Sequence, residues 1–114
     1  MRLFSIGTRS KLLERFKSLT DSIKAQELAI EAYRETREQL KYNADVFEAE
    51  LYLAERQKVV KTTEANLEAL ITTNQDLQAK RVAVIEKDNQ YKKALIDLNY
   101  LQNNLRATEL EIRL

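Results

Sequence analysis

Residues 55–67, "ERQKVVKTTEANL", decide whether this chain folds back on itself or continues as one rod. The stretch holds no Gly, no Pro and no Asn-Gly pair, yet the spacing of apolar residues shifts by about two residues inside it. A continuous coiled coil absorbs insertions of three or four residues, and this shift is neither. We therefore predict a bend at 56–63, with Thr62 or Thr63 as the N-cap of the helix that follows.

Two alternatives to this bend remain open. The stretch "ITTNQDL", residues 71–77, supplies the Thr, Asn and Asp side chains that start helices, which would put the bend at 71–76 instead. The lack of a Gly or Asn-Gly turn within 55–67 is equally compatible with a continuous rod-like helix.

Apolar residues recur at alternating intervals of four and three on both sides of this stretch, which is typical of coiled-coil helices. The expected fold class is therefore all-α, a long antiparallel helical hairpin or coiled coil that forms oligomers. We expect a basic, irregular N-terminal segment over residues 1–10, ending in Ser10 as a helix N-cap, and a single helical coiled-coil domain over 11–114. The predicted helix-interface core comprises Leu12, Phe16, Leu19, Ile23, Ile30, Tyr33, Leu40, Phe47, Leu51, Leu67, Leu70, Leu77, Val84, Tyr91, Leu95, Leu98, Leu105 and Ile112.

Polar side chains interrupt these apolar seams. A polar residue in a helix interface favours the alignment in which it finds a partner, so we interpret this set as register or specificity determinants. The set consists of Gln26, Arg37, Asn74, Arg81 and Asp88. Two other interpretations of the second arm stay open: its polar positions border a hydrated interior of a multi-helix barrel, or they face solvent.

Large apolar residues also lie outside the seams. They are Leu53, Ile71, Ile85, Ile96 and Tyr100. A lone two-helix hairpin leaves such side chains in water, so we expect a second contact face that packs on other helices.

The composition argues against catalysis. The chain has no Cys and no His, which removes thiol nucleophiles, the usual zinc ligands and the best proton carrier near neutral pH. We expect no catalytic, metal or cofactor site, no small-molecule substrate and no enzymatic activity. Nucleic acid is not an expected partner either, because Glu27, Glu31 and Glu35 surround Tyr33, where a stacking platform would need basic residues.

Charge is unevenly distributed along the chain. Residues 1–20 carry five basic side chains against one acidic, about +4, while residues 21–57 carry five against nine, about −4. The basic side chains of the first segment are Arg2, Arg9, Lys11, Arg15 and Lys17. Mixed with apolar residues, they suit contact with an anionic membrane surface, docking on acidic protein, or a mitochondrial presequence.

Neither a secretory signal nor a run of about 20 apolar residues is found, which favours the cytoplasm or a soluble assembly. Two family resemblances can be drawn. The stretches "FEAELYLAERQ" and "YKKALIDLNYLQNNL" resemble the long helices of outer-membrane efflux channel proteins, whose hairpins build a tubular barrel. The start "MRLFSIG" followed by long charged helices is similar in layout to the phage-shock and ESCRT-III-like membrane-remodelling proteins. Neither resemblance is taken as a family assignment.

These patterns predict a non-enzymatic structural or assembly protein, a self-associating coiled-coil subunit or spacer in a larger helical complex such as a virion or secretion machine. Its partners would be copies of itself or other helical subunits. The alternative is a peripheral membrane-binding or membrane-remodelling scaffold that uses the basic N-terminus.

Overall fold

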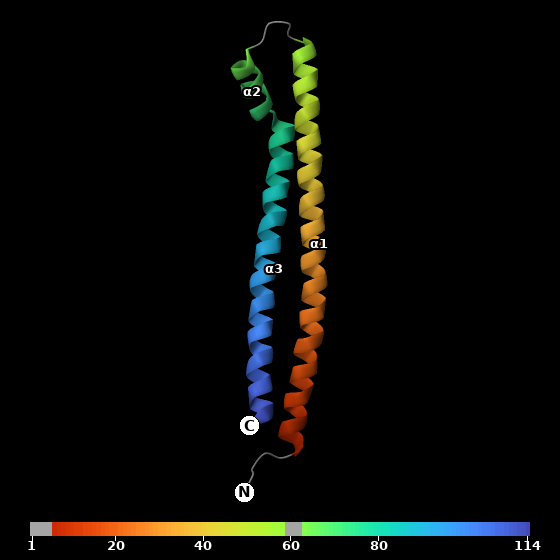
Figure 1. Ribbon diagram of the computed structural model, residues 1–114, viewed down its shortest axis with the longest axis vertical. Coiled ribbons are helices and arrows are strands. Elements are labelled where there is room, and N and C mark those ends of the chain that lie inside the picture. Colours follow the sequence, from red (N-terminus) through yellow and green to blue (C-terminus); the bar gives the residue numbers. More distant parts are fainter. Residues whose placement is uncertain (1–5, 59–62) are drawn as a thin grey trace. The chain divides into compact units, whose positions relative to one another are not determined.

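A computed structural model describes residues 6–58 and 63–114 of the chain. In this part the fold is all-α, as predicted, with helices α1 (Ile6–Lys58), α2 (Glu64–Thr72) and α3 (Gln75–Arg113) (Figure 1). The residues group into two compact units. Unit 1 consists of Met1–Ala32 and Tyr91–Leu114, and unit 2 consists of Tyr33–Gln90. Each unit therefore combines a segment of α1 with a segment of α3.

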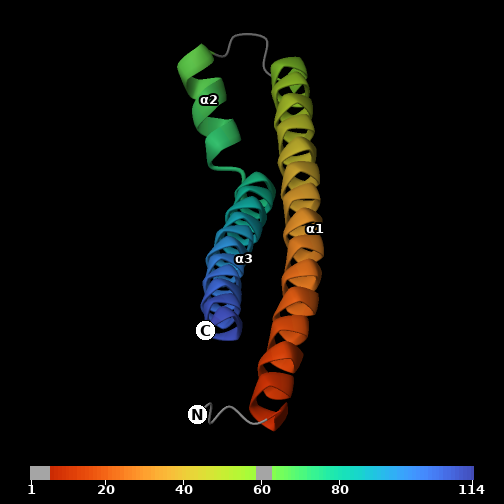
Figure 2. The same ribbon diagram turned by 60° about the horizontal axis from the view of Figure 1, so that its bottom comes forward.

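Within unit 2 the chain reverses direction. As residue numbers rise along α1 from Arg37 to Asp45, the residues that they pair with on α3 fall from Asp88 to Arg81. Helix α2 runs in the same sense as the start of α3, opposite to α1 (Figures 1 and 2). This arrangement confirms the predicted antiparallel helical hairpin.

Unit 1 shows the same antiparallel order. Arg15 on α1 lies 3.7 Å from Glu111 near the end of α3, and Gln26, further along α1, bonds to Ala94, earlier in α3. The long uninterrupted helices follow from composition, since the chain has no Pro and a single Gly, the two residue types that most strongly break helices.

The predicted bend at 56–63 coincides with the end of α1 at Lys58 and the start of α2 at Glu64. Thr63 has extended φ and ψ of −68° and 152°, and its Oγ1 accepts a hydrogen bond from the Asn66 N–H at 3.2 Å. Thr63 is thus the N-cap, as one form of the prediction had it, whereas Thr62 and the rest of 59–62 lie outside the described residues. The helix does not run unbroken through this stretch.

The competing stretch at 71–77 also interrupts the helix. Helix α2 ends at Thr72, the Thr73 N–H bonds to the Ala69 carbonyl at 3.1 Å, and Asn74 caps α3 by accepting from the Leu77 N–H at 3.0 Å. These bonds satisfy backbone groups that a helix end leaves without intrahelical partners. The capping chemistry was predicted correctly, but it produces an angle between α2 and α3 (Figure 2) rather than the reversal of the chain.

The N-terminal boundary differs from the prediction. Helix α1 begins at Ile6, so residues 6–10 are helical rather than irregular, and Ser10 lies inside the helix instead of capping it. Residues 1–5 are outside the described part. Gly, Thr and Ser cost only about 0.5–1 kcal/mol each relative to Ala in a helix, a preference that packing overrides. Such packing exists here, because Arg9 Nη1 donates to the Ile112 carbonyl at the end of α3, 3.4 Å away.

Most of the predicted core lies between the helices, at partial burial. Ile23, Leu67 and Leu77 are buried. The half-buried members are Leu12, Phe16, Leu19, Ile30, Tyr33, Leu40, Phe47, Leu51, Val84, Tyr91, Leu98, Leu105 and Ile112. Partial burial is expected when a helix packs against one neighbour, because only one stripe of each helix is covered.

Two predicted core residues are exposed instead, Leu70 at 49% and Leu95 at 40%. The prediction extended the apolar spacing of α3 back to Leu70. The helix is interrupted at 73–74, so this spacing does not continue into α2, which buries Leu67 and Ile71 instead. Ile71 was expected off the seam and is 1% exposed, so that prediction was wrong. Its neighbours in the same set stay outside as expected: Leu53, Ile85, Ile96 and Tyr100 are all exposed.

At Leu95 the seam is shifted by one residue. Ala94 is buried in its place, and further along α3 Thr108 is buried, its hydroxyl donating to the Asn104 carbonyl at 2.9 Å. Neither residue was predicted in the core, because a small side chain and a polar one give a weak hydrophobic signal in a sequence. Small side chains at an interface allow two helix backbones to approach closely.

Candidate assembly interface

Arg37 and Asp88, two of the predicted register residues, form an ion pair across unit 2. Arg37 Nη1 donates to Asp88 Oδ1 at 2.8 Å, and the two side chains are 26% and 27% exposed. Both were predicted to lie on seams, on opposite arms, but the sequence did not show that they pair with each other. A charge-assisted bond of this kind fixes the alignment of α1 with α3 in this unit.

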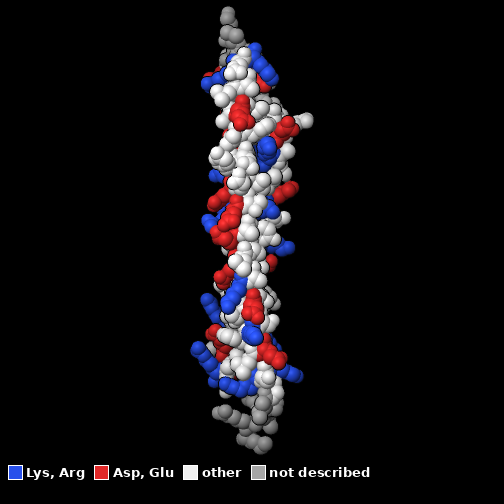
Figure 3. Space-filling view, turned by 90° about the vertical axis from the view of Figure 1, so that its right-hand side faces the viewer, with Lys and Arg blue, Asp and Glu red and all other residues white. Residues whose placement is uncertain are grey.

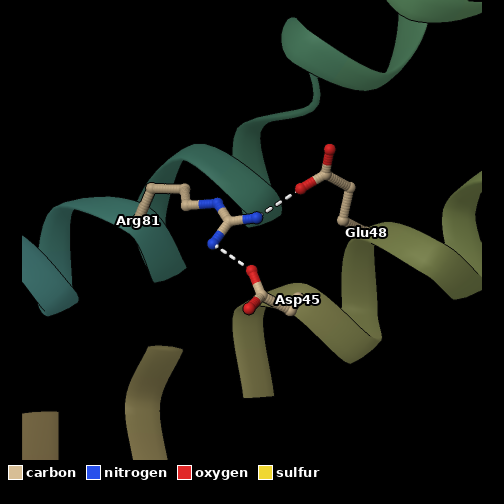
Figure 4. Close-up of polar contacts among 3 residues, drawn as sticks. All are labelled: Asp45, Glu48 and Arg81. Carbon is tan, nitrogen blue, oxygen red and sulfur yellow. Dashed lines mark hydrogen bonds and ion pairs between the residues drawn. The ribbon is translucent and has the colours of Figure 1, made fainter. Parts of the chain in front are cut away.

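Arg81 connects α3 to two carboxylates of α1 (Figure 4). Its Nη1 lies 2.7 Å from Asp45 Oδ1, and its Nη2 donates to Glu48 Oε2. Asp45 and Glu48 are three residues apart, so one turn of α1 places both carboxylates toward the planar guanidinium. Hydrogen bonds to Asp45 and then Glu48 raise the pKa of Arg81 above its already high usual value.

The other two predicted register residues act on backbone atoms. Gln26 Nε2 donates to the Ala94 carbonyl at 3.0 Å in unit 1, at the point where the seam of α3 is shifted. Asn74 is the N-cap of α3, a local role within one chain. Solvent exposure, one of the interpretations left open for the second arm, does not describe Arg81 and Asp88, which are half-buried and bonded to α1.

Aromatic seam residues in unit 2 are covered by lysines from α3. Lys80 Nζ lies 5.1 Å from the centre of the Phe47 ring, and Lys87 Nζ lies 5.4 Å from the centre of the Tyr33 ring. Cations at such distances are attracted to the ring face, and the lysine stems cover apolar area that the helix pair leaves open. The contacts add to the alignment of the two helices.

The basic residues of the N-terminal segment fall into three groups. Arg2 lies outside the described residues. Arg9 and Arg15 contact the end of α3 in unit 1, at the Ile112 carbonyl and the Glu111 carboxylate. Lys11 and Lys17 are exposed. Two of the five basic residues, for which a membrane surface, docking on protein and a presequence were all left open, therefore contact protein atoms.

The outward face of α1 in unit 2 carries an apolar stripe. It consists of Tyr42, Val46, Ala49 and Leu53, all exposed and spaced by four, three and four residues. Ala44 is fully buried, and Tyr42 and Val46 each lie two positions from it, about 200° around the helix. The stripe therefore points away from α3, and we call it the α1 outer stripe. Figure 3, which looks at the side where α1 lies, shows uncharged surface between acidic and basic side chains.

A second stripe lies on α3 in unit 1. It consists of Ile96, Tyr100, Ala107 and Leu110, all exposed, with Asn103 in line between the second and third. Leu98 and Thr108 lie on the opposite, covered side of the helix. We call this set the α3 outer stripe. Both outer stripes repeat with the same alternation of four and three that the covered seams use, which is the spacing needed for packing on a further helix.

Within residues 6–58 and 63–114, no group of three or more His, Cys, Asp or Glu side chains is placed to hold a metal ion. Among the helices of this part, none combines the length and hydropathy that crossing a membrane requires.

Comparison with family models, with curated proteins and with solved structures finds no match for the chain. The similarity to efflux channel helices and to membrane-remodelling proteins therefore stays a resemblance of short stretches and of layout.

Proposed function

We propose that this chain is a non-enzymatic structural subunit that associates with copies of itself through coiled-coil contacts. The α1 outer stripe carries the proposal, because it repeats the apolar spacing of a helix interface on an exposed face that none of the described helices of its unit covers. Fully burying a Val or Leu side chain contributes about 1.5–3 kcal/mol, so a few such residues per copy can drive association.

The internal ion pairs support the same proposal. Arg37 with Asp88, and Arg81 with Asp45 and Glu48, fix the alignment of α1 on α3. A fixed alignment keeps the outer face of each helix in a constant orientation within its unit. A subunit that repeats in an assembly needs such a constant surface, because every copy must present the same contacts.

Mass in solution tests the proposal. One chain has a mass of 13.3 kDa, and light scattering after size exclusion should give a multiple of this mass that increases with protein concentration. A mass of one chain across the whole concentration range, with the helical circular dichroism intact, would refute self-association.

Binding to an anionic membrane surface is the alternative proposal. Lys11, Lys17 and Leu13 are exposed at the start of α1, which suits a lipid headgroup region. Arg9 and Arg15 count against it, since they already contact the end of α3.

A further inference from the structure

The two outer stripes differ in the charges beside them. Glu35 lies on the line of the α1 outer stripe one heptad before Tyr42, and Glu50 flanks it beside Ala49. Both carboxylates are on exposed residues. Arg56, next along the same line, is engaged with Glu64 at 2.8 Å. The border of the α1 outer stripe is therefore acidic.

The α3 outer stripe has a mainly basic border. Lys93 lies in line with the stripe, three residues before Ile96, and Arg106 and Arg113 flank its C-terminal half. These three residues are exposed. Acidic neighbours are Asp97 and Glu111, of which Glu111 is drawn toward Arg15 at 3.7 Å.

The units as wholes follow the same division of charge. Unit 1 carries ten basic and seven acidic side chains, a formal charge of +3, and unit 2 carries nine and eleven, a formal charge of −2. Like stripes facing each other would bring like charges together, whereas unlike stripes would pair acidic borders with basic ones.

From this complementarity we infer that the α3 outer stripe of one copy packs on the α1 outer stripe of a second copy, a head-to-tail contact between two different surfaces of the same chain. Apolar side chains spaced by four and three on both partners can interdigitate, and Lys93, Arg106 and Arg113 then lie near the acidic border that includes Glu35 and Glu50. The inference rests on the proposed self-association.

Two copies that exchange this contact reciprocally form a twofold dimer, and copies that make it in one direction only continue into a ring or a filament. In either form the associated fraction should increase with protein concentration and decrease with salt, which screens the charged borders.

Two complementary variants test the direction of the contact. Tyr42→Glu with Leu53→Glu blocks the α1 outer stripe, and Ile96→Glu with Leu110→Glu blocks the α3 outer stripe. Each variant alone should remain at the mass of one chain, with a dissociation constant raised about tenfold or more. A one-to-one mixture should give a complex of two chains, because each variant retains the surface that its partner lacks.

Leu70→Glu is the matched control, since Leu70 is an exposed Leu that belongs to neither stripe. This variant should assemble as the unmodified chain does. Circular dichroism shows whether each variant keeps its helices, and the charge reversals Glu35→Lys with Glu50→Lys supply a second block that leaves the apolar residues intact. These reversals should weaken assembly in the same way.

The outcomes separate the inference from the proposal beneath it. An unmodified chain that stays at the mass of one copy overturns both. An unmodified chain that assembles, with both blocked variants assembling equally well, overturns the head-to-tail contact alone. Variants that are separately monomeric and remain so when mixed indicate a contact between like surfaces, which also overturns it.

Discussion

Arg37 Nη1 lies 2.8 Å from Asp88 Oδ1, and this bond joins α1 to α3 in unit 2 with each side chain about three-quarters covered. A shift of one helix by a single turn would move the two groups apart by about 5.4 Å. Neither charge is fully hydrated at its position. An alignment shifted by one turn would therefore separate the two charges without returning them fully to water. The pair therefore penalises wrong alignments more than it stabilises the correct one.

Replacing Asp88 by Leu should lower the free energy of unfolding by about 1–2 kcal/mol, between the values for exposed and for buried pairs. The double change Arg37→Leu with Asp88→Leu should recover most of this loss, since both charges of the pair are then removed together. Urea unfolding of the unmodified chain, the two single variants and the double variant, all at one protein concentration, measures the coupling free energy between the two residues. Additive effects of the two single changes would show that the pair contributes nothing as a pair.

Arg81 forms ion pairs with both Asp45 and Glu48. The change Arg81→Leu therefore leaves two neighbouring carboxylates without the cation that they share. We expect a loss of about 1 kcal/mol, which 1 M salt reduces because these groups are partly exposed. Arg81→Lys is the matched control and should keep part of the contact as a point charge. Equal unfolding free energies for Arg81→Leu and the unmodified chain at low salt would contradict the role assigned to this cluster.

The pH dependence of this cluster follows from the raised pKa of Arg81. A cation with a raised folded-state pKa contributes fully below its unfolded pKa, and the contribution disappears only as pH rises through the folded value. For Arg81 that window lies above the usual pKa of an arginine side chain. The difference in stability between the unmodified chain and Arg81→Leu should thus stay constant from about pH 7 to about pH 11.

The break between α2 and α3 depends on Asn74, whose side chain accepts the Leu77 N–H at 3.0 Å. Asn74→Ala should cost about 1 kcal/mol, and Asn74→Asp should cost little because Asp also caps helices well. Amide hydrogen exchange at residues 75–78 measures the local effect. Faster exchange in the Asp variant than in the Ala variant would show that the cap is not what protects this turn.

The helical fold could be predicted, and each helix break was recognised as a candidate, though as alternatives to one another, because the signals are local. Thr63 and Asn74 cap helices through bonds to residues three positions on, and such spacing is visible in a sequence. Which break reverses the chain was a harder matter, since both stretches supply caps. That choice depends on contacts between distant residues such as Arg37 and Asp88.

The seam was harder to predict where its residues are small or polar. Ala94 and Thr108 are buried, while the adjacent larger Leu95 is exposed. Hydrophobicity favours Leu95 over Ala94, but close approach of two helices favours the smaller residue, and packing decides between them. Leu70 was predicted wrongly because the apolar spacing of α3 was extended across the helix break into α2, where the spacing is different.

The shifted seam gives a direct test in unit 1. Ala94→Leu inserts three carbons into a covered position beside the Gln26 contact, and overpacking of this kind costs about 1–3 kcal/mol. Leu95→Ala, one position away, should change the free energy of unfolding by less than about 0.5 kcal/mol in the absence of association. Thermal unfolding at low concentration compares the two. A larger change in the free energy of unfolding for Leu95→Ala than for Ala94→Leu would indicate that Leu95, as the apolar pattern predicts, lies in the helix interface.

The basic residues at the start of α1 have two proposed roles, docking on protein and binding to a membrane surface, which can be distinguished by experiment. Arg15 lies 3.7 Å from Glu111, and Arg9 reaches the Ile112 carbonyl, so docking predicts that these side chains contribute to the stability of unit 1. Arg9→Gln with Arg15→Gln should then lower the melting temperature by a few degrees, whereas Lys11→Gln with Lys17→Gln, the matched exposed pair, should not. Co-sedimentation with vesicles containing anionic lipid provides the opposing measurement. Two results together would favour the membrane surface over docking. The first is vesicle binding at low salt that is lost in the Lys11 and Lys17 variant, and the second is an unchanged melting temperature for the Arg9 and Arg15 variant.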